Sequence, residues 1–332
     1  MIQREFNLEK QIDFSFSQNE YDFIVKEIPI DFSKKGNFLI LKIKKRNLST
    51  WDMIESISKY LRIELNEIGY AGLKDKNATT TQYISIPKKY EKELKNIRSN
   101  KIEIKEIFLH DKKLNIGDLK ANRFIINLKD IDFIKLNQIE KIVKKISKIG
   151  MPNYFGFQRF GKDWEKNIEK AKELINGDFH IKDRKLEKML LSGYQSLYFN
   201  SWLVYRLKLN KNDFELLDGD IFHNLETNKY FTSKKIDNNI KKDFENKKIV
   251  PTGLLPGNKV FRSILQSRLI EQKFDNNEIY EKGYRRDALI FPEIKNINYK
   301  KEEKICTLDF ILSKGSYATV FIENIANKNF NF

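Results

Sequence analysis

Residues 69–82 read GYAGLKDKNATTTQ. A short apolar piece leads into a turn at Gly72. Strand character then resumes from residue 81 to 86, where Pro87 stops it. The pattern therefore predicts a glycine turn between two strand-like pieces, a place where a polar side chain can be presented by rigid backbone.

Asp75 is the residue in this turn that can carry chemistry. It stands between Lys74 and Lys76. Ammonium groups favour an ionised carboxylate, so we expect a lowered pKa for Asp75 if both lysines lie close to it. An ionised carboxylate beside positive charge can act as a nucleophile or as a base. The structural alternative is a solvated surface turn, since exposed turns are rich in Lys and Asp.

A second unusual stretch, PNYFGFQRFG, occupies residues 152–161. Its aromatic side chains stand beside Asn153 and Arg159, and this combination can stack on a nucleic-acid base and hydrogen-bond its edges. A loop whose rings fill the core explains Tyr154 and Phe160 equally well. Both interpretations stay open at this point.

Strand patterns dominate both ends of the chain, and helical patterns dominate its middle. Strand signals cover residues 12–16, 23–25, 38–44, 101–109, 122–128, 306–312 and 317–325. Helical spacing covers residues 51–61, 136–149, most of 163–208, and 260–274. PTGLLPG, at 251–257, reads as a loop. This order predicts an α/β protein of the α+β type, whose sheet uses both ends of the chain around an inserted, mostly helical domain.

The charge balance points to a partner with dense negative charge. The chain has 332 residues, 62 Lys plus Arg against 46 Asp plus Glu, and a net charge of +16. A phosphate backbone is the commonest partner of such a surface, although a solvated basic surface explains the same number. With 40% hydrophobic residues the chain is long enough and apolar enough to bury a sizeable core.

The sequence argues against disulfides, metal sites, several common catalytic motifs and membrane spans. The single Cys306 excludes an intrachain disulfide and a thiolate zinc cluster, and the three histidines are widely spaced, so we expect no metal site. The phosphate-loop, dinucleotide, serine-hydrolase and zinc-protease motifs are missing. No apolar run is long enough to span a membrane, and we expect a soluble, cytoplasmic protein.

The two unusual stretches together resemble one family. GYAGLKDKNATTTQ resembles the signature of the tRNA pseudouridine synthase D (TruD) family, roughly F-A-G-x-K-D-[KR]-x-A-x-T-x-Q. PNYFGFQRFG is similar to the family's P-N-Y-F-G-x-Q-R-F-G at every fixed position. Weaker echoes follow in family order, at DFIVKEI (22–28), IGDLKANRF (116–124) and LSKGSYAT (312–319). The chain departs from the family at Ser17, where a lysine is usual, and at Ser313, where a proline is usual.

The resemblance implies a fold and an activity. The fold is a pseudouridine synthase catalytic core with a mixed, largely antiparallel sheet, formed by residues 1–162 and 289–332 and interrupted by a mostly helical TRUD insertion domain at 163–288. The activity is the isomerisation of uridine to pseudouridine in tRNA, at uridine 13 of the D-arm, without a cofactor or metal. We expect a monomer whose partner is tRNA.

The resemblance also implies roles for individual residues. Asp75 matches the catalytic aspartate, and Glu27 matches an acid near the active site. Three residues match base-binding or active-site positions: Asn153, Phe155 and Tyr317. Three basic residues are expected to contact the RNA or tune the aspartate: Lys74, Lys76 and Arg159.

Alternatives remain at the level of the reaction. Asp75 can attack C1′ of the ribose as a nucleophile, or it can remove a sugar proton to give a glycal, and the sequence does not choose. A non-catalytic RNA-binding protein would explain the charge and the aromatic residues without needing Asp75. A metal-free RNA hydrolase or glycosylase would use similar residues but release a base or cut a strand.

Overall fold

The computed structural model describes residues 11–97, 99–161, 163–210 and 214–330, and the chain within them forms two compact units. We call residues 13–140 with 292–315 the sheet unit. The described residues of 11–12, 141–291 and 316–330 form the helical unit. Residues 141–161 and 316–330 thus belong to the same compact unit as the middle of the chain. The predicted domain boundaries at 162/163 and 288/289 stay a prediction, and residue 162 itself lies outside the described residues.

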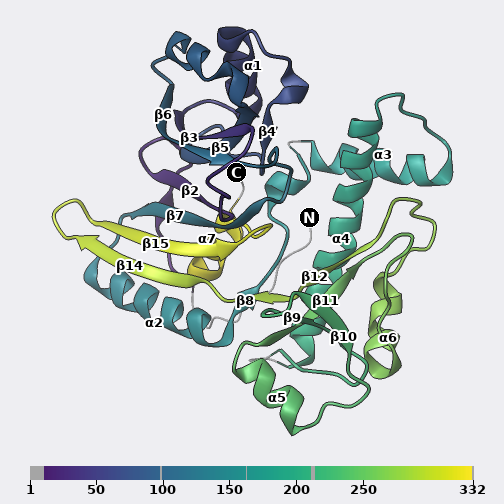
Figure 1. Ribbon diagram of the computed structural model, residues 1–332. Helices are drawn as coiled ribbons and strands as arrows, with labels where there is room; N and C mark the ends of the chain where they lie inside the picture. Colours follow the sequence, from purple (N-terminus) through teal and green to yellow (C-terminus); the bar gives the residue numbers. More distant parts are fainter. Residues whose placement is uncertain (1–10, 98, 162, 211–213, 331–332) are drawn as a thin grey trace. The chain divides into compact units, whose positions relative to one another are not determined.

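The sheet unit contains a mixed sheet of nine described strands (Figure 1). Its main order is β14-β15-β7-β2-β5-β3-β6, with β1 paired to β7 and β4 to β5. The strands are β1 (Ser15–Phe16), β2 (Phe23–Pro29), β3 (Phe38–Arg46), β4 (Gly69–Tyr70), β5 (Thr79–Pro87), β6 (Ile102–His110), β7 (Leu119–Lys129), β14 (Glu293–Lys300) and β15 (Ile305–Ser313). Only the β2–β5 pairing is parallel among these strands. The expectation of a mixed, largely antiparallel sheet is confirmed.

Alternation along β3 explains how this sheet builds its core. Leu39, Leu41 and Ile43 point to one face, where they pack with apolar residues of α1 (Thr50–Leu61). Ile40 points to the other face and packs with Tyr83. Figure 1 shows α1 lying over the β3–β5 part of the sheet.

Helix α1 begins with a capping box. The Ser49 hydroxyl accepts from the Asp52 N–H, and the Asp52 carboxylate accepts from the Ser49 N–H. Trp51 is 47% exposed, and its ring packs edgewise on Tyr70 at 5.6 Å. Burial within α1 is supplied by Met53, Ile54, Ile57 and Leu61.

The helical unit combines a helix pair with two small sheets. Helices α3 (Trp164–Asn176) and α4 (Arg184–Leu209) pack through a shared apolar cluster, and α4 runs along β11 (Figure 1). The other helices are α5 (Asn238–Glu245), α6 (Leu265–Glu271) and α7 (Ala318–Ala326). The larger sheet has the order β10-β9-β11-β12 and the smaller one pairs β13 with β8. Their strands are β8 (Met151–Pro152), β9 (Ile221–Asn224), β10 (Lys229–Thr232), β11 (Ile249–Leu255), β12 (Tyr284–Asp287) and β13 (Leu289–Ile290). Helix α2 (Phe133–Ile149) carries the chain from one unit into the other.

Two expectations about elements are wrong, and both concern fully buried segments. PTGLLPG is not a loop, because residues 249–255 form β11 and every one of them is buried. A Cβ on Gly253 would lie 2.3 Å from the Trp202 ring, so the glycine lets α4 approach the strand. The tail over 317–325 is not a strand but is mostly α7, whose residues are all buried. A segment that is buried on every side shows no regular spacing of polar residues. The β-branched residues of α7 then resemble those of a strand.

A third expectation is only partly confirmed. The helical pattern over 260–274 becomes α6, which starts at Leu265, followed by a short 3-10 turn over Gln272–Phe274. Residues 260–264 are not helical. Among the described residues, no helix has both the length and the apolar character needed to cross a bilayer.

Candidate active site

The loop that carries Asp75 joins β4 to β5 in the sheet unit, and its backbone is held from two sides. The N–H of Lys74 donates to the Thr50 hydroxyl at 2.9 Å. The ammonium of Lys45 donates to the carbonyl of Asp75 at 3.0 Å and to the carbonyl of Leu48 at 2.5 Å. Both bonds tie the loop to segments that precede it by more than 20 residues, so the backbone at Asp75 is preorganised.

Lys74 anchors the same loop through its side chain. Its ammonium lies 2.7 Å from the Glu27 carboxylate, and both side chains are almost fully buried. The Tyr83 N–H donates to the other Glu27 oxygen at 3.2 Å. Burial raises the pKa of Glu27, while the positive charge of Lys74 works in the opposite direction. Lys74 and Glu27 therefore form a buried ion pair beneath the loop.

The expected lowering of the Asp75 pKa is wrong. Removal from water by the surrounding protein raises the pKa of Asp75, and the charges of Lys45 and Lys74 only partly oppose this effect. Asp75 is nevertheless exposed to solvent, so the desolvation that raises its pKa comes from protein packed around part of the residue and not from full burial. One flanking lysine is committed to Glu27, and Lys76 is exposed. The lysines that flank Asp75 in the sequence therefore do not offset the effect of desolvation on its pKa.

Lys45 is a site residue that the sequence reasoning missed. It is fully buried, and burial lowers its pKa to about 8, although the charge of Asp75 works in the opposite direction. The sequence does hold a signal for it. Position 45 continues the inward-facing series Leu39, Leu41 and Ile43, so a lysine falls on the buried face of β3.

The aromatic residues of the second motif assemble in the helical unit. The Phe155 ring is 8% exposed and meets Tyr317 edgewise, with 6.2 Å between centroids and 63° between planes. Gly156 makes room for this contact, because a Cβ there would lie 3.0 Å from the Tyr317 ring. The Asn200 amide accepts from the Phe155 N–H at 2.9 Å and donates to its carbonyl at 3.0 Å. Phe155 is thus held through both its ring and its backbone.

Asn153 is 5% exposed, and the protein uses both ends of its amide. Its oxygen accepts from Arg286 at 2.7 Å, and its nitrogen donates to the carbonyl of Asp287 at 3.0 Å. Arg159 donates from Nε to the Ser196 hydroxyl at 3.1 Å. A direct role of Asn153 in reading a base would require these bonds to open.

The eight predicted site residues therefore fall into two sets. The structure places one set on the catalytic loop and its supports in the sheet unit: Asp75, Glu27, Lys74 and Lys76. The other set lies around the second motif in the helical unit: Asn153, Phe155, Arg159 and Tyr317. The described residues contain no group of three or more His, Cys, Asp or Glu that could hold a metal ion.

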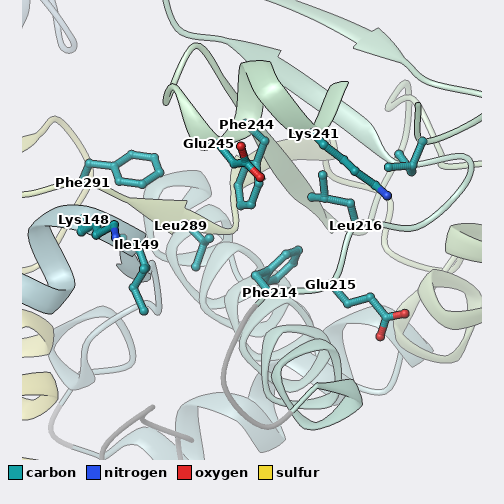
Figure 2. A pocket seen from close by; sticks show the side chains of 12 residues that line it. Lys148, Ile149, Phe214, Glu215, Leu216, Lys241, Phe244, Glu245, Leu289 and Phe291 are labelled. Atoms are coloured by element: carbon teal, nitrogen blue, oxygen red, sulfur yellow. The ribbon is translucent and has the colours of Figure 1, made fainter. Parts of the chain in front are cut away.

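A cavity of about 760 Å³ lies in the helical unit (Figure 2). Phe214, Phe244 and Phe291 contribute to its apolar lining, and Lys and Glu side chains stand among them. None of the eight predicted residues lines this cavity. This cavity is therefore separate from the two motifs.

Comparisons with known proteins agree with both motifs. A model of the family described as tRNA pseudouridine synthase D (TruD) matches residues 8–182 and 179–325. The chain belongs to the TruD family. It is 40% identical to a tRNA pseudouridine synthase D of Wolinella succinogenes and 39% identical to one of Nitratiruptor, with 96% of each chain covered in both cases.

The TruD fold is confirmed by a solved structure. The crystal structure of a putative tRNA pseudouridine synthase D (TruD) from Methanosarcina mazei superposes with a TM-score of 0.76. It covers 98% of this chain and 96% of its own, at 23% sequence identity. At this identity the likeness concerns the fold. The TruD assignment itself rests on the family match and on the more similar relatives.

Proposed function

We propose that this TruD-family chain isomerises uridine to pseudouridine in tRNA, at uridine 13 of the D-arm, with Asp75 as its catalytic group. One observation carries the proposal. Asp75 matches the aspartate of the stretch that resembles the TruD signature, and it lies on a loop whose backbone is fixed by Lys45 and Thr50. A carboxylate presented on fixed backbone loses little orientational freedom when it reacts, which is what an efficient nucleophile or base needs.

The reaction balances without an added reagent. The N1–C1′ bond of the nucleotide breaks and its electron pair leaves with the uracil. After the base turns, a C5–C1′ bond forms, C5 loses a proton and N1 gains one. Asp75 either bonds to C1′ and is later displaced, or removes a sugar proton and returns it. Nothing is oxidised and no group is transferred to another molecule, so the proposed chemistry calls for no cofactor.

The aromatic set suits the binding of an unstacked base. Extruding a base from its stack costs a few kcal/mol, and stacking on an aromatic ring can return about 1–3 kcal/mol. Tyr317 is partly exposed and can supply that ring, whereas Phe155 is buried and supports it edgewise. Arg159 and Lys76 add positive charge for phosphate contacts. A chain acting on tRNA in this way would work in the cytoplasm, and we propose that it works as a monomer.

The test uses a transcribed tRNA with uridine at position 13, incubated with the purified protein in EDTA. Carbodiimide labelling with primer extension should reveal pseudouridine at that position for the parent and none for Asp75→Ala or Asp75→Asn. Both variants should still bind the tRNA, because they remove no positive charge. Activity retained by Asp75→Asn would refute the catalytic role.

The same reaction separates the rival functions by mass and length. Isomerisation leaves both unchanged, whereas a glycosylase releases a base and a hydrolase shortens the strand. A modified uridine elsewhere in the tRNA would keep the activity and correct the position. Tight binding with unchanged RNA, for total cellular RNA as well as this tRNA, would favour the non-catalytic alternative.

A further inference from the structure

Arg286, at the end of β12, touches three consecutive residues of the second motif. Its guanidinium carbon lies 3.9 Å from the centroid of the Phe155 ring, well within cation–π range. Nε donates to the Asn153 carbonyl at 2.9 Å, and one terminal nitrogen donates to the Asn153 side-chain oxygen at 2.7 Å. The same nitrogen lies 3.5 Å from the Tyr154 carbonyl. A single side chain thus holds both a ring and an amide of the motif.

Backbone carbonyls next to Arg286 also bind Asn153. The Asp287 carbonyl accepts from the Asn153 side-chain nitrogen at 3.0 Å, and the Ala288 carbonyl accepts from the Asn153 N–H at 2.9 Å. With Arg286 on the amide oxygen, the side chain of Asn153 has one orientation that satisfies both of its ends. Residues 286–288 and the motif therefore form one hydrogen-bonded unit.

Keeping Arg286 charged at this position costs desolvation free energy. Burial lowers its pKa to about 10. The nearby Arg159 charge, 5.4 Å from the same Phe155 ring, acts in the same direction, whereas Tyr317 and Asp287 act against it. The motif oxygens that Arg286 contacts are neutral amide and carbonyl oxygens. An apolar side chain would avoid this desolvation. What the guanidinium adds is geometry, since its planar fork donates in fixed directions while its face covers a ring.

We propose that Arg286 is a positioning residue of the uridine site, which fixes the Phe155 ring and the Asn153 amide so that the aromatic set is preformed for the base. The inference rests on the proposed function and deepens it. Arg286 lies outside both family motifs, within residues 163–288, so the segment predicted as an insertion supplies part of the base-binding machinery. Asn153 then acts on the substrate through the orientation of Phe155.

The test compares Arg286→Met, Arg286→Lys and Phe155→Leu with the parent, and uses Lys282→Met as the control. Lys282 is exposed and its ammonium lies 5.4 Å from the Tyr284 ring, so its removal deletes one nearby positive charge without touching the motif. For each protein, kcat, KM, the tRNA Kd and Tm are measured. Circular dichroism identifies any variant that fails to fold, and Arg286→Lys then replaces Arg286→Met.

We expect Arg286→Met to lower kcat about tenfold or more while the tRNA Kd changes less than about threefold. Arg286→Lys should recover part of kcat, because an ammonium keeps the charge over the ring but loses the fork. Lys282→Met should keep the parent kcat. The Arg286→Met, Phe155→Leu double variant should be no slower than the slower single variant, since both changes disable the same ring.

The outcomes separate the positioning role of Arg286 from the proposed function. A folded Arg286→Met, or Arg286→Lys in its place, with the parent kcat overturns the positioning role and leaves the proposed function intact. A loss confined to Kd, or strictly multiplicative effects of the two substitutions, also overturns it, because Arg286 would then contact RNA or act apart from Phe155. A parent protein that forms no pseudouridine in any RNA overturns the proposed function, and the positioning role falls with it.

Discussion

The Lys45 ammonium donates to the backbone carbonyl of Asp75, and the charge of each side chain shifts the pKa of the other. Burial raises the pKa of Asp75 and lowers that of Lys45, and the opposite charge of each partner partly restores the ordinary value. Lys45 thus has two functions at the residue scale. It anchors the carbonyl of Asp75, and its charge keeps the carboxyl more acidic than burial alone would allow.

This arrangement predicts the acid side of the pH–rate profile. Both possible roles of Asp75 need the carboxylate, so kcat should rise with pH as Asp75 ionises, and the midpoint should lie above the ordinary aspartate value because the pKa is raised. Lys45→Met removes a charge that lowers this pKa and should move the midpoint to higher pH. Single-turnover rates across pH measure it.

Lys44→Met is the matched control, since it removes the neighbouring positive charge from the same strand but from the other face of the pleat. Its midpoint should coincide with that of the parent. A Lys45→Met midpoint that stays in place, or moves to lower pH, would show that Lys45 does not tune Asp75.

At the scale of elements, the start of α1 connects the helix, the sheet and the catalytic loop. The Thr50 hydroxyl donates to the Gln82 side-chain oxygen of β5 at 3.1 Å and accepts from the Lys74 N–H at 2.9 Å. Thr50 and Gln82 are both buried, so neither bond can be replaced easily by water. The position of the loop therefore depends on the first residue of a neighbouring helix as well as on the loop's own sequence.

Thr50→Val tests this connection, because valine keeps the shape of threonine and removes both hydrogen bonds. The buried Gln82 side-chain oxygen and the partly buried Lys74 N–H lose their partner, and the free energy of unfolding should fall by about 1–3 kcal/mol. We expect kcat to fall as well, since the Lys74 backbone beside Asp75 loses an anchor. Denaturant unfolding and kcat are measured together.

Thr50→Ser keeps the hydroxyl and is the control, and it should retain most of the stability and the rate. Equal losses in Thr50→Ser and Thr50→Val would assign the effect to the methyl group and its packing. An unchanged kcat in a destabilised Thr50→Val would show that this hydrogen bond does not position the loop.

At the scale of the whole molecule, the net charge of +16 governs association with RNA. Lysines and arginines that contact phosphates release counterions, so the affinity should depend strongly on salt. The steps of catalysis within the bound complex should depend on it much less, because buried and partly buried charges are screened weakly.

The tRNA affinity should fall about tenfold or more between about 50 and about 200 mM salt, linearly on logarithmic axes. Asp75→Asn should give the same slope, since it removes no phosphate contact. Filter binding at several salt concentrations measures both proteins. A salt-independent affinity would mean that the basic surface is merely solvated, as the alternative interpretation of the composition has it.

The sequence by itself indicated the family, located the central strands and singled out Asp75 as the candidate catalytic residue. Period-two alternation located β3, β6, β7 and β15 to within a few residues, because a strand's burial pattern is a local property. It failed for β11 and α7, where burial on every side erases the period. The two motifs were recognisable because their chemistry-bearing residues are contiguous.

Only the tertiary structure decided what those residues contact. The partner of Lys74 is Glu27, and the Asn153 amide is occupied by residues more than 130 positions away. The direction of the Asp75 pKa shift also belongs to the fold, because desolvation depends on all surrounding atoms and outweighs the two charges beside it. Lys45 and Arg286 stayed hidden for the same reason: a single basic residue in a strand acquires its role only when the fold places carbonyl oxygens and a ring around it.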